Sequence, residues 1–335
     1  MRHINLPIFI PHLGCPHTCV FCNQHLIAAH AAFSLATAKQ EIDAFLATAD
    51  KDAEIELAYF GGSFTALPSE QMDALLQLAA PYLADHRIAG IRVSTRPDAI
   101  SDVICEKLLR GGVTTVELGV QSTDDTVLAA SERGHTAADA RQAFACLHRH
   151  GLPVIGQMMV GLPNATLATE LQTARDLIAF GCQGVRIYPV AVFRGTRLET
   201  LWQNGIYTPL SVEEAVERSA QVLSIFLGAK LPVLRIGLCA EDGFQKDDSL
   251  RAGGYHPALG ELVRSRIYLS RMTDALCANP PKIGSTVKIA VRTGQCSQAI
   301  GQKRENIRKL CNQFSLHALS VLEDPTLSPY QIRIL

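Results

Sequence analysis

Apolar runs of strand length alternate with segments of helical period from the start of the chain to about residue 240. This alternation predicts a parallel β-sheet whose strands are joined by helical crossovers. An open barrel related to the (β/α)8 fold and a doubly wound sheet both satisfy it, and periodicity alone does not separate them. The predicted strands are Leu6–Ile10, Glu54–Phe60, Ile91–Thr95, Thr115–Leu118, Val154–Met159, Val185–Tyr188 and Val233–Ile236. The predicted helices include Ala38–Ala47, Ser69–Tyr82, Asp102–Leu109, Ala137–His150, Thr166–Ala179 and Val212–Phe226.

Unusual residues follow each of the first five predicted strands. In both candidate folds the carboxyl ends of parallel strands meet at one edge of the sheet, which is where such folds bind ligands. We therefore expect these five clusters to form one rim. In strand order they are the three cysteines Cys15, Cys19 and Cys22, then Gly61-Gly62-Ser63, Arg96-Pro97-Asp98, Gly119 with Gln121 and Ser122, and Gly161-Leu162-Pro163.

Composition narrows the class of protein. Hydrophobic residues make up 47% of the chain and charged residues 19%, so extended disorder is not expected. A formal net charge of -1 excludes electrostatic capture of nucleic acid by the whole chain, although a local basic patch is compatible with it. Ten cysteines in 335 residues are too sparse for a disulfide scaffold and suit a reducing compartment. We expect a cytoplasmic protein without a signal peptide or a membrane span, because the apolar stretch Ile4–Ile10 is short and contains Pro7.

The three clustered cysteines lie within eight residues, a spacing that one loop can wrap around a metal centre. Thiolates are the ligands of iron–sulfur clusters, and a cubane held by three of them leaves its fourth iron open. A structural zinc site is the alternative. It normally has a fourth ligand at regular spacing, for which this segment offers His12, His17 or His25. The cysteines favour iron–sulfur over zinc.

The spacing CxxxCxxC, with Phe21 before the last cysteine, resembles the signature of the radical S-adenosylmethionine (SAM) superfamily. The resemblance implies a partial (β/α) barrel and a [4Fe-4S] cluster ligated by the three cysteines. It implies that the open iron chelates the amino and carboxylate groups of SAM. Reductive cleavage then gives a 5′-deoxyadenosyl radical that abstracts hydrogen from a substrate. It further implies a low-potential electron donor of the flavodoxin or ferredoxin type.

The same resemblance implies a SAM shell at the predicted rim. The segment Tyr59–Thr65 is similar to the glycine motif of the superfamily, with Ser63 where many members carry glutamate. Glu117 lies in an otherwise apolar strand, where a carboxylate is costly unless paired, so we expect it to bond SAM or a partner such as Arg133. Arg133 is either a two-pronged clamp for the SAM carboxylate or a surface salt bridge. The implied cofactor-binding residues are Phe21, Gly61, Gly62, Ser63, Glu117, Gln121, Arg133 and Gln157.

Two further stretches indicate which branch of the superfamily the chain resembles. Glu117–Ser122 and Arg133-Gly134-His135 resemble the branch that contains oxygen-independent coproporphyrinogen oxidases and the Elongator catalytic subunit. The stretch from Arg186 to Tyr207 is similar to the Elongator subunit and less like the porphyrinogen branch. The resemblance covers about residues 5–240 and includes no acetyltransferase segment. It therefore implies the cluster and the SAM site, but not the acetyl-CoA-dependent modification of wobble uridine.

The sequence predicts two domains, a radical SAM core at residues 1–257 and a small α+β unit at 258–335. The order strand–helix–GxxR–helix–strand–strand in the second unit resembles a KH-type RNA-binding module, which clamps single strands with a GXXG loop. Gly301, Lys303 and Arg304 would form that loop, with Arg304 replacing the second glycine. From Lys282 onward there are eight Lys/Arg and three Asp/Glu, a local net charge of +5. The alternative is a dimerisation or packing domain with a solvated basic helix.

Three functions are therefore compatible with the sequence. The leading hypothesis is a radical SAM enzyme that acts on RNA, with tRNA as the substrate. The second is a small-molecule or porphyrin-type radical SAM oxidoreductase in which the C-terminal unit only packs. The third is a non-catalytic RNA-binding protein that carries a structural metal.

Overall fold

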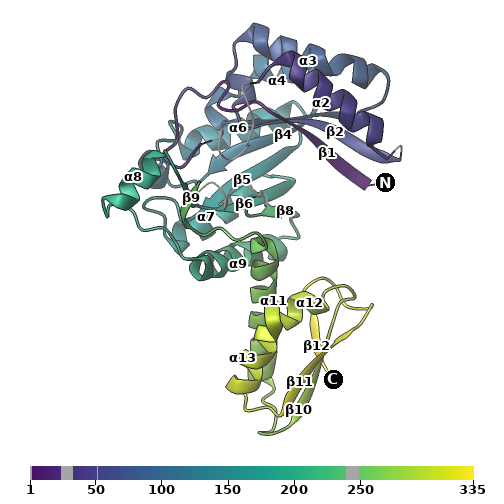
Figure 1. Cartoon of the computed structure of the whole chain (residues 1–335), viewed down its shortest axis with the longest axis vertical. Helices are drawn as coiled ribbons and strands as arrows, with labels where there is room; N and C mark the ends of the chain where they lie inside the picture. The colour runs from purple at the N-terminus through teal and green to yellow at the C-terminus, as the bar shows by residue number, and fades with distance from the viewer. Residues whose placement is uncertain (1, 24–32, 51, 239–248) are drawn as a thin grey trace.

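The structure is a computed structural model that describes residues 2–23, 33–50, 52–238 and 249–335 (Figure 1). Its centre is a seven-stranded sheet in which all paired neighbours run parallel, in the order β1-β2-β3-β4-β5-β6-β8. The strands are β1 (Arg2–Phe9), β2 (Ala53–Phe60), β3 (Gly90–Thr95), β4 (Val113–Gln121), β5 (Val154–Val160), β6 (Gly184–Pro189) and β8 (Val233–Ile236). Two short strands, β7 (Ala191–Phe193) and β9 (Leu250–Gly253), form a separate antiparallel pair.

Helices connect these strands. They are α2 (Leu35–Thr48), α3 (Ser69–Ala84), α4 (Asp102–Arg110), α5 (Asp125–Ala130), α6 (Ala137–Arg149), α7 (Leu167–Ala179), α8 (Arg197–Gln203) and α9 (Val212–Gly228), with short 3-10 turns η1 (Phe64–Ala66) and η2 (Pro97–Ala99). Most begin at a serine, threonine or aspartate whose side chain accepts a hydrogen bond from the first turn, as at Ser34, Ser101 and Ser211. The polar caps therefore fix where the crossovers start.

The strand order distinguishes between the two folds that the sequence allowed. Spatial order follows chain order from β1 to β6 without a reversal, so every crossover moves the chain in the same direction around the sheet. A doubly wound sheet would reverse its order at a switch point. The sheet instead curls into a partial barrel, which confirms the fold predicted from the resemblance.

The C-terminal unit is tied to the partial barrel by a long helix, α11 (Leu259–Ala278). It contains β10 (Thr286–Val291), α12 (Cys296–Ile300), the turn η3 (Gln302–Arg304), α13 (Glu305–Gln313), β11 (Ala318–Glu323) and β12 (Ile332–Ile334). Strand β10 pairs parallel to β11 and antiparallel to β12. Helix α11 packs against α9 on one side and against α12 and α13 on the other, and its buried side chains belong to one continuous apolar core (Figure 1). In the described ranges no helix combines the length and the apolar character needed to cross a membrane.

The loop between α12 and α13 holds two cationic residues in an uncommon backbone conformation. Lys303 has a φ of 48° and Arg304 a φ of 59°, both in the left-handed region. Arg304 stands where the KH pattern has its second glycine, the residue that adopts this region most readily. A residue with a Cβ atom costs roughly 1–2 kcal/mol more there than in the right-handed region.

We expect Arg304→Gly to raise the free energy of unfolding by about 0.5–1 kcal/mol, since the relief of backbone strain exceeds the entropy lost by a glycine. The matched control is Arg308→Gly, because Arg308 is exposed within α13. That change should lower the free energy of unfolding by about 1 kcal/mol. Urea denaturation of the two variants measures both effects. Equal destabilisation by both would contradict the strain at Arg304.

Candidate functional site

The cysteine loop is fastened to the loop that follows β2. The Ser63 amide donates to the Leu13 carbonyl at 2.8 Å, and the His12 amide donates to the Gly61 carbonyl at 3.0 Å. The loops approach so closely that a Cβ atom at Gly62 would lie 2.4 Å from the Leu13 carbonyl oxygen. Only glycine fits there without moving the backbone. The sequence Gly61-Gly62-Ser63 therefore sets the position of the cysteine loop.

All three cysteine thiols line one cavity of about 110 Å³ at the carboxyl ends of the strands. Clusters from the ends of the first four strands meet there, as the rim hypothesis predicted. Among the predicted cofactor-binding residues, those that line it are Phe21, Gly61, Gly62, Ser63, Gln121, Arg133 and Gln157. Glu117 does not line it.

The fifth cluster follows β5 at the same edge of the parallel sheet, and its Leu162 shares an apolar cluster with Val20 of the cysteine loop, but it does not line the cavity at the cysteines. Gly161-Leu162-Pro163 lines a second cavity of about 340 Å³. The Gly161 amide donates to the Glu170 carboxylate at 2.6 Å, and the Tyr207 hydroxyl donates to the Gly161 carbonyl at 2.7 Å. These bonds direct the loop after β5 toward α7 and the segment between α8 and α9.

Arg133 connects the cysteine loop to the end of β4. Its Nη1 donates to Cys19 Sγ at 3.0 Å and its Nη2 donates to the Gly119 carbonyl at 2.6 Å. The guanidinium of Arg96 donates to the Arg133 carbonyl at 2.5 Å and holds this segment in place. On the other side, Cys15 Sγ lies 3.3 Å from Ser63 Oγ. Arg133 is thus a buried charge at the sulfurs, not a surface salt bridge.

The spacing of the three sulfurs indicates which kind of metal centre they suit. Among the described residues, Cys15, Cys19 and Cys22 do not form a group whose ligand atoms all lie within 4.8 Å of one another. Two thiolates on a single tetrahedral zinc ion would be about 3.8 Å apart. A [4Fe-4S] cluster offers a separate iron to each thiolate, so it does not require the sulfurs to lie that close together. Of the histidines considered as fourth zinc ligands, His12 and His17 line the cavity and His25 lies outside the described residues.

Gln121 gives the cavity an unpartnered polar group. It has a φ of 66°, and the pairing of β4 with β5 shifts register between Gly119 and Gln121. Its Oε1 atom is buried and has no hydrogen-bond partner in the described part of the chain, and the same holds for Arg133 Nε. Strained backbone and unsatisfied polar atoms concentrate at binding sites. An acceptor and a cationic donor beside the thiols fit a ligand with an amino group and a carboxylate, as SAM has.

Glu117 belongs to a buried network beside the cavity. Its carboxylate accepts bonds from Arg186 Nη2 at 2.7 Å, Gln157 Nε2 at 2.7 Å and Arg92 Nη1 at 3.2 Å. The sequence correctly implied that this carboxylate needs a partner. The partner suggested there, Arg133, is instead engaged with Cys19 and Gly119. Gln157 both bonds Glu117 and lines the cavity, so it joins the network to the site.

Ser94 and Thr95, at the end of β3, also line the cavity, in the segment that the resemblance places beside SAM. Thr95 Oγ1 lies 2.6 Å from Thr65 Oγ1, a contact that joins the end of β3 to η1. His135, from the Arg133-Gly134-His135 motif, is buried and hydrogen-bonded to the Val120 carbonyl at 3.2 Å. Burial, together with the nearby Arg133 charge, lowers the pKa of His135 to about 4, so it is a neutral structural group at pH 7.

Two family models match the chain. One, described as the Radical SAM superfamily, matches residues 9–177, and the other, the Radical_SAM C-terminal domain, matches residues 182–268. The second match ends within α11, beyond the predicted domain boundary at residue 257.

Similar proteins include Elongator complex protein 3 of Mus musculus, which is 30% identical over 192 residues, 51% of this chain and 35% of that protein. A tRNA uridine(34) acetyltransferase of Dehalococcoides mccartyi is 33% identical over 176 residues, 47% of this chain and 38% of that protein. The matches thus span little more than a third of these relatives.

Solved structures share the fold. The Elongator protein 3 of Methanocaldococcus infernus, with an N-terminal deletion, superposes with a TM-score of 0.62 at 23% identity and covers 81% of this chain and 63% of that one. Methylornithine synthase gives a TM-score of 0.51 at 14% identity, covering 76% of this chain and 75% of that one.

Proposed function

The chain belongs to the radical SAM superfamily, and we propose that it is an enzyme that cleaves SAM reductively to start radical chemistry on RNA, with tRNA as the substrate. The proposal of SAM cleavage is supported above all by one observation: three thiols and the unpartnered Oε1 atom of Gln121 converge on one cavity. A [4Fe-4S] cluster, supplied with electrons by an external low-potential donor, would contribute the redox chemistry.

The side chains at the cavity then take distinct roles. Cys15, Cys19 and Cys22 would hold the cluster. Arg133 places a positive charge and a hydrogen bond at Cys19 Sγ, and groups of this kind tune cluster potentials. Phe21 is partly buried, lines the cavity and packs against the apolar cluster that contains Val20, where it would help to exclude water from the iron–sulfur cluster.

The SAM-binding groups would lie across the cavity from the cysteines. The backbone at Gly61 and Gly62 and the Gln121 amide would contact the methionine moiety, and Gln157 the ribose or adenine. Glu117 would act through Gln157, because both of its carboxylate oxygens already accept bonds within the buried network. It is then a positioning residue for SAM.

The C-terminal unit supports RNA as the substrate class. Lys303 and Arg304 are exposed and have no ion-pair partner within 4.0 Å in the described ranges, whereas nearby Lys309 pairs with Glu305 at 2.7 Å. The loop that carries them is anchored by Asn306. Its buried amide donates to Ser265 Oγ at 2.9 Å and to the Ala299 carbonyl at 3.0 Å. A fixed loop with two free cations suits a phosphate backbone. The names of the similar proteins point to tRNA.

We expect Lys303→Glu/Arg304→Glu to weaken tRNA binding by at least about tenfold at low salt. If both residues neutralise phosphates of single-stranded RNA, the slope of log K against log salt concentration should fall by about 1.4. Fluorescence anisotropy with labelled tRNA, measured over a salt series, gives both quantities.

The control is Lys39→Glu/Arg110→Glu, which makes the same change in charge at exposed positions on α2 and α4. It should retain most of the affinity and the wild-type slope. Unchanged binding in the Lys303/Arg304 variant, or equal losses in both variants, would refute the proposed RNA contact. Tetrapyrrole binding without tRNA binding would support the porphyrin-type alternative.

A further inference from the structure

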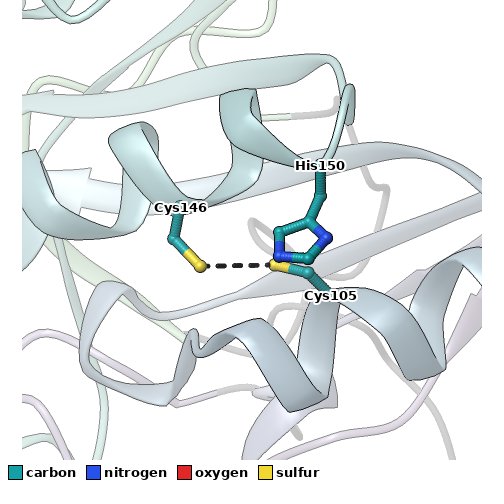
Figure 2. A group of neighbouring side chains, drawn as sticks. All are labelled: Cys105, Cys146 and His150. Carbon is teal, nitrogen blue, oxygen red and sulfur yellow. Dashed lines mark hydrogen bonds between the residues drawn. The ribbon is translucent and has the colours of Figure 1, made fainter.

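Two helices on the outside of the sheet bring together a second set of metal-ligating side chains. Asp102 and Cys105 are three residues apart at the start of α4, while Cys146 and His150 are four residues apart at the end of α6. Residues at these spacings share one face of a helix. Figure 2 shows Cys146 and His150 directed toward Cys105 on the facing helix. None of the four lines the cavity at the clustered cysteines.

The distances within this group resemble those around a single ion. Cys105 Sγ and Cys146 Sγ are 3.7 Å apart, and a His150 ring nitrogen lies within 4.8 Å of both (Figure 2). Two thiolates bound at about 2.3 Å to one tetrahedral zinc ion would be about 3.8 Å apart. Asp102 Oδ1 is 3.4 Å from Cys146 Sγ and 2.9 Å from His150 Nε2, so a carboxylate borders the group of three on one side. In the described chain this is the one group of three or more donors that meets so closely.

A positive side chain also contacts the group. Arg149 Nη2 donates a hydrogen bond to Asp102 Oδ1 at 2.9 Å, so a bound cation would share this carboxylate with the Arg149 guanidinium.

We propose that Cys105, Cys146, His150 and Asp102 bind one zinc ion that fastens α4 to α6. Two sulfurs and an imidazole nitrogen in a compact set, with a carboxylate oxygen beside them, suit zinc, which takes these ligands in tetrahedral geometry. Four protein ligands close the coordination shell, so the ion is structural. It is separate from the iron–sulfur chemistry, because none of its ligands lines the cavity at Cys15, Cys19 and Cys22.

The test uses the full-length chain with its iron–sulfur cluster reconstituted, so that Cys15, Cys19 and Cys22 are occupied. The holoenzyme is equilibrated anaerobically with Zn²⁺ and desalted, and zinc and iron are measured by plasma mass spectrometry. We expect one zinc per chain in the wild type and none in Cys146→Ala or His150→Ala. The controls are Cys182→Ala, another buried thiol, and His148→Ala, another histidine of α6, and both should retain the zinc.

A second readout guards against misfolding of the variants. The His150 side chain is 20% exposed, so His150→Ala is expected to fold. Added Zn²⁺ should raise the unfolding temperature of the wild type and leave that of His150→Ala unchanged. Asp102→Asn should weaken zinc binding by about tenfold or more, whether Asp102 binds the ion or orients His150.

Several outcomes would overturn the proposal. They are wild-type holoenzyme that retains no zinc, zinc that persists in both Cys146→Ala and His150→Ala, and equal loss in the control variants. A Cys105–Cys146 disulfide in anaerobically purified protein, seen as the loss of two hydrogens in the intact mass, would assign the pair to redox chemistry instead.

Discussion

Replacing Cys19 by alanine is expected to abolish loading of the iron–sulfur cluster and to reduce formation of 5′-deoxyadenosine from SAM to background. Cys19 is the buried member of the three cysteines, and its sulfur accepts the hydrogen bond from Arg133. Two remaining thiolates would not hold a cubane, because each iron of the cluster needs its own protein or substrate ligand. The loss should be complete.

The experiment is anaerobic reconstitution with iron and sulfide, followed by reduction, addition of SAM and quantification of 5′-deoxyadenosine. The control is Cys277→Ala, since Cys277 is an exposed cysteine of α11 far from the cavity in sequence. It should load and cleave like the wild type. Cluster loading by Cys19→Ala, or a wild-type protein that loads no iron–sulfur cluster, would refute the proposed chemistry. A wild type that loads but does not cleave SAM, even with tRNA present, would favour the non-catalytic alternative.

Most of the elements were predictable because each one is specified locally. The predicted strand Val233–Ile236 has the bounds of β8, and Val154–Met159 differs from β5 by one residue. Strand β1, predicted at Leu6–Ile10, begins four residues earlier, at Arg2. Strand β4 also departs from its prediction. It was predicted at Thr115–Leu118 and extends to Gln121, because Gly119 and Gln121 were interpreted as residues that end the strand. The strand instead continues through them with a shift in register, a feature that depends on its neighbour β5.

The sequence predicted which residues belong to the site, but not which side chains they form hydrogen bonds with. The cysteines and the glycines stand out by residue type and by their position after a strand. The partners of Glu117 come from β3, β5 and β6, and no local pattern identifies which buried arginine reaches a given carboxylate. The same limit applies to Cys105 and Cys146. They are separate in sequence, and only the packing of α4 against α6 brings their sulfurs together.

Glu117→Ala is expected to have the largest effect on stability, lowering the free energy of unfolding by about 3–5 kcal/mol. The Glu117 side chain is 1% exposed and compensates two buried guanidinium groups, those of Arg92 and Arg186. Arg92 keeps Glu56 as a partner, but Arg186 loses its carboxylate while it stays buried. The unfolding temperature should fall by roughly 6–20 °C. Glu117→Gln should have a smaller effect, since an amide oxygen still accepts a hydrogen bond.

The matched control is Glu106→Ala on α4, whose side chain is 58% exposed and lies 4.0 Å from Arg110. Removing this surface pair should change stability by no more than about 0.5 kcal/mol. Equal stability of the two alanine variants would show that the buried network does not need the Glu117 carboxylate.

Glu117→Gln then separates the two roles assigned to this residue. If Glu117 only positions Gln157, the variant should bind SAM with modestly reduced affinity and still cleave it. If Glu117 contacts SAM directly, as the resemblance implied, cleavage should fall far more than stability does.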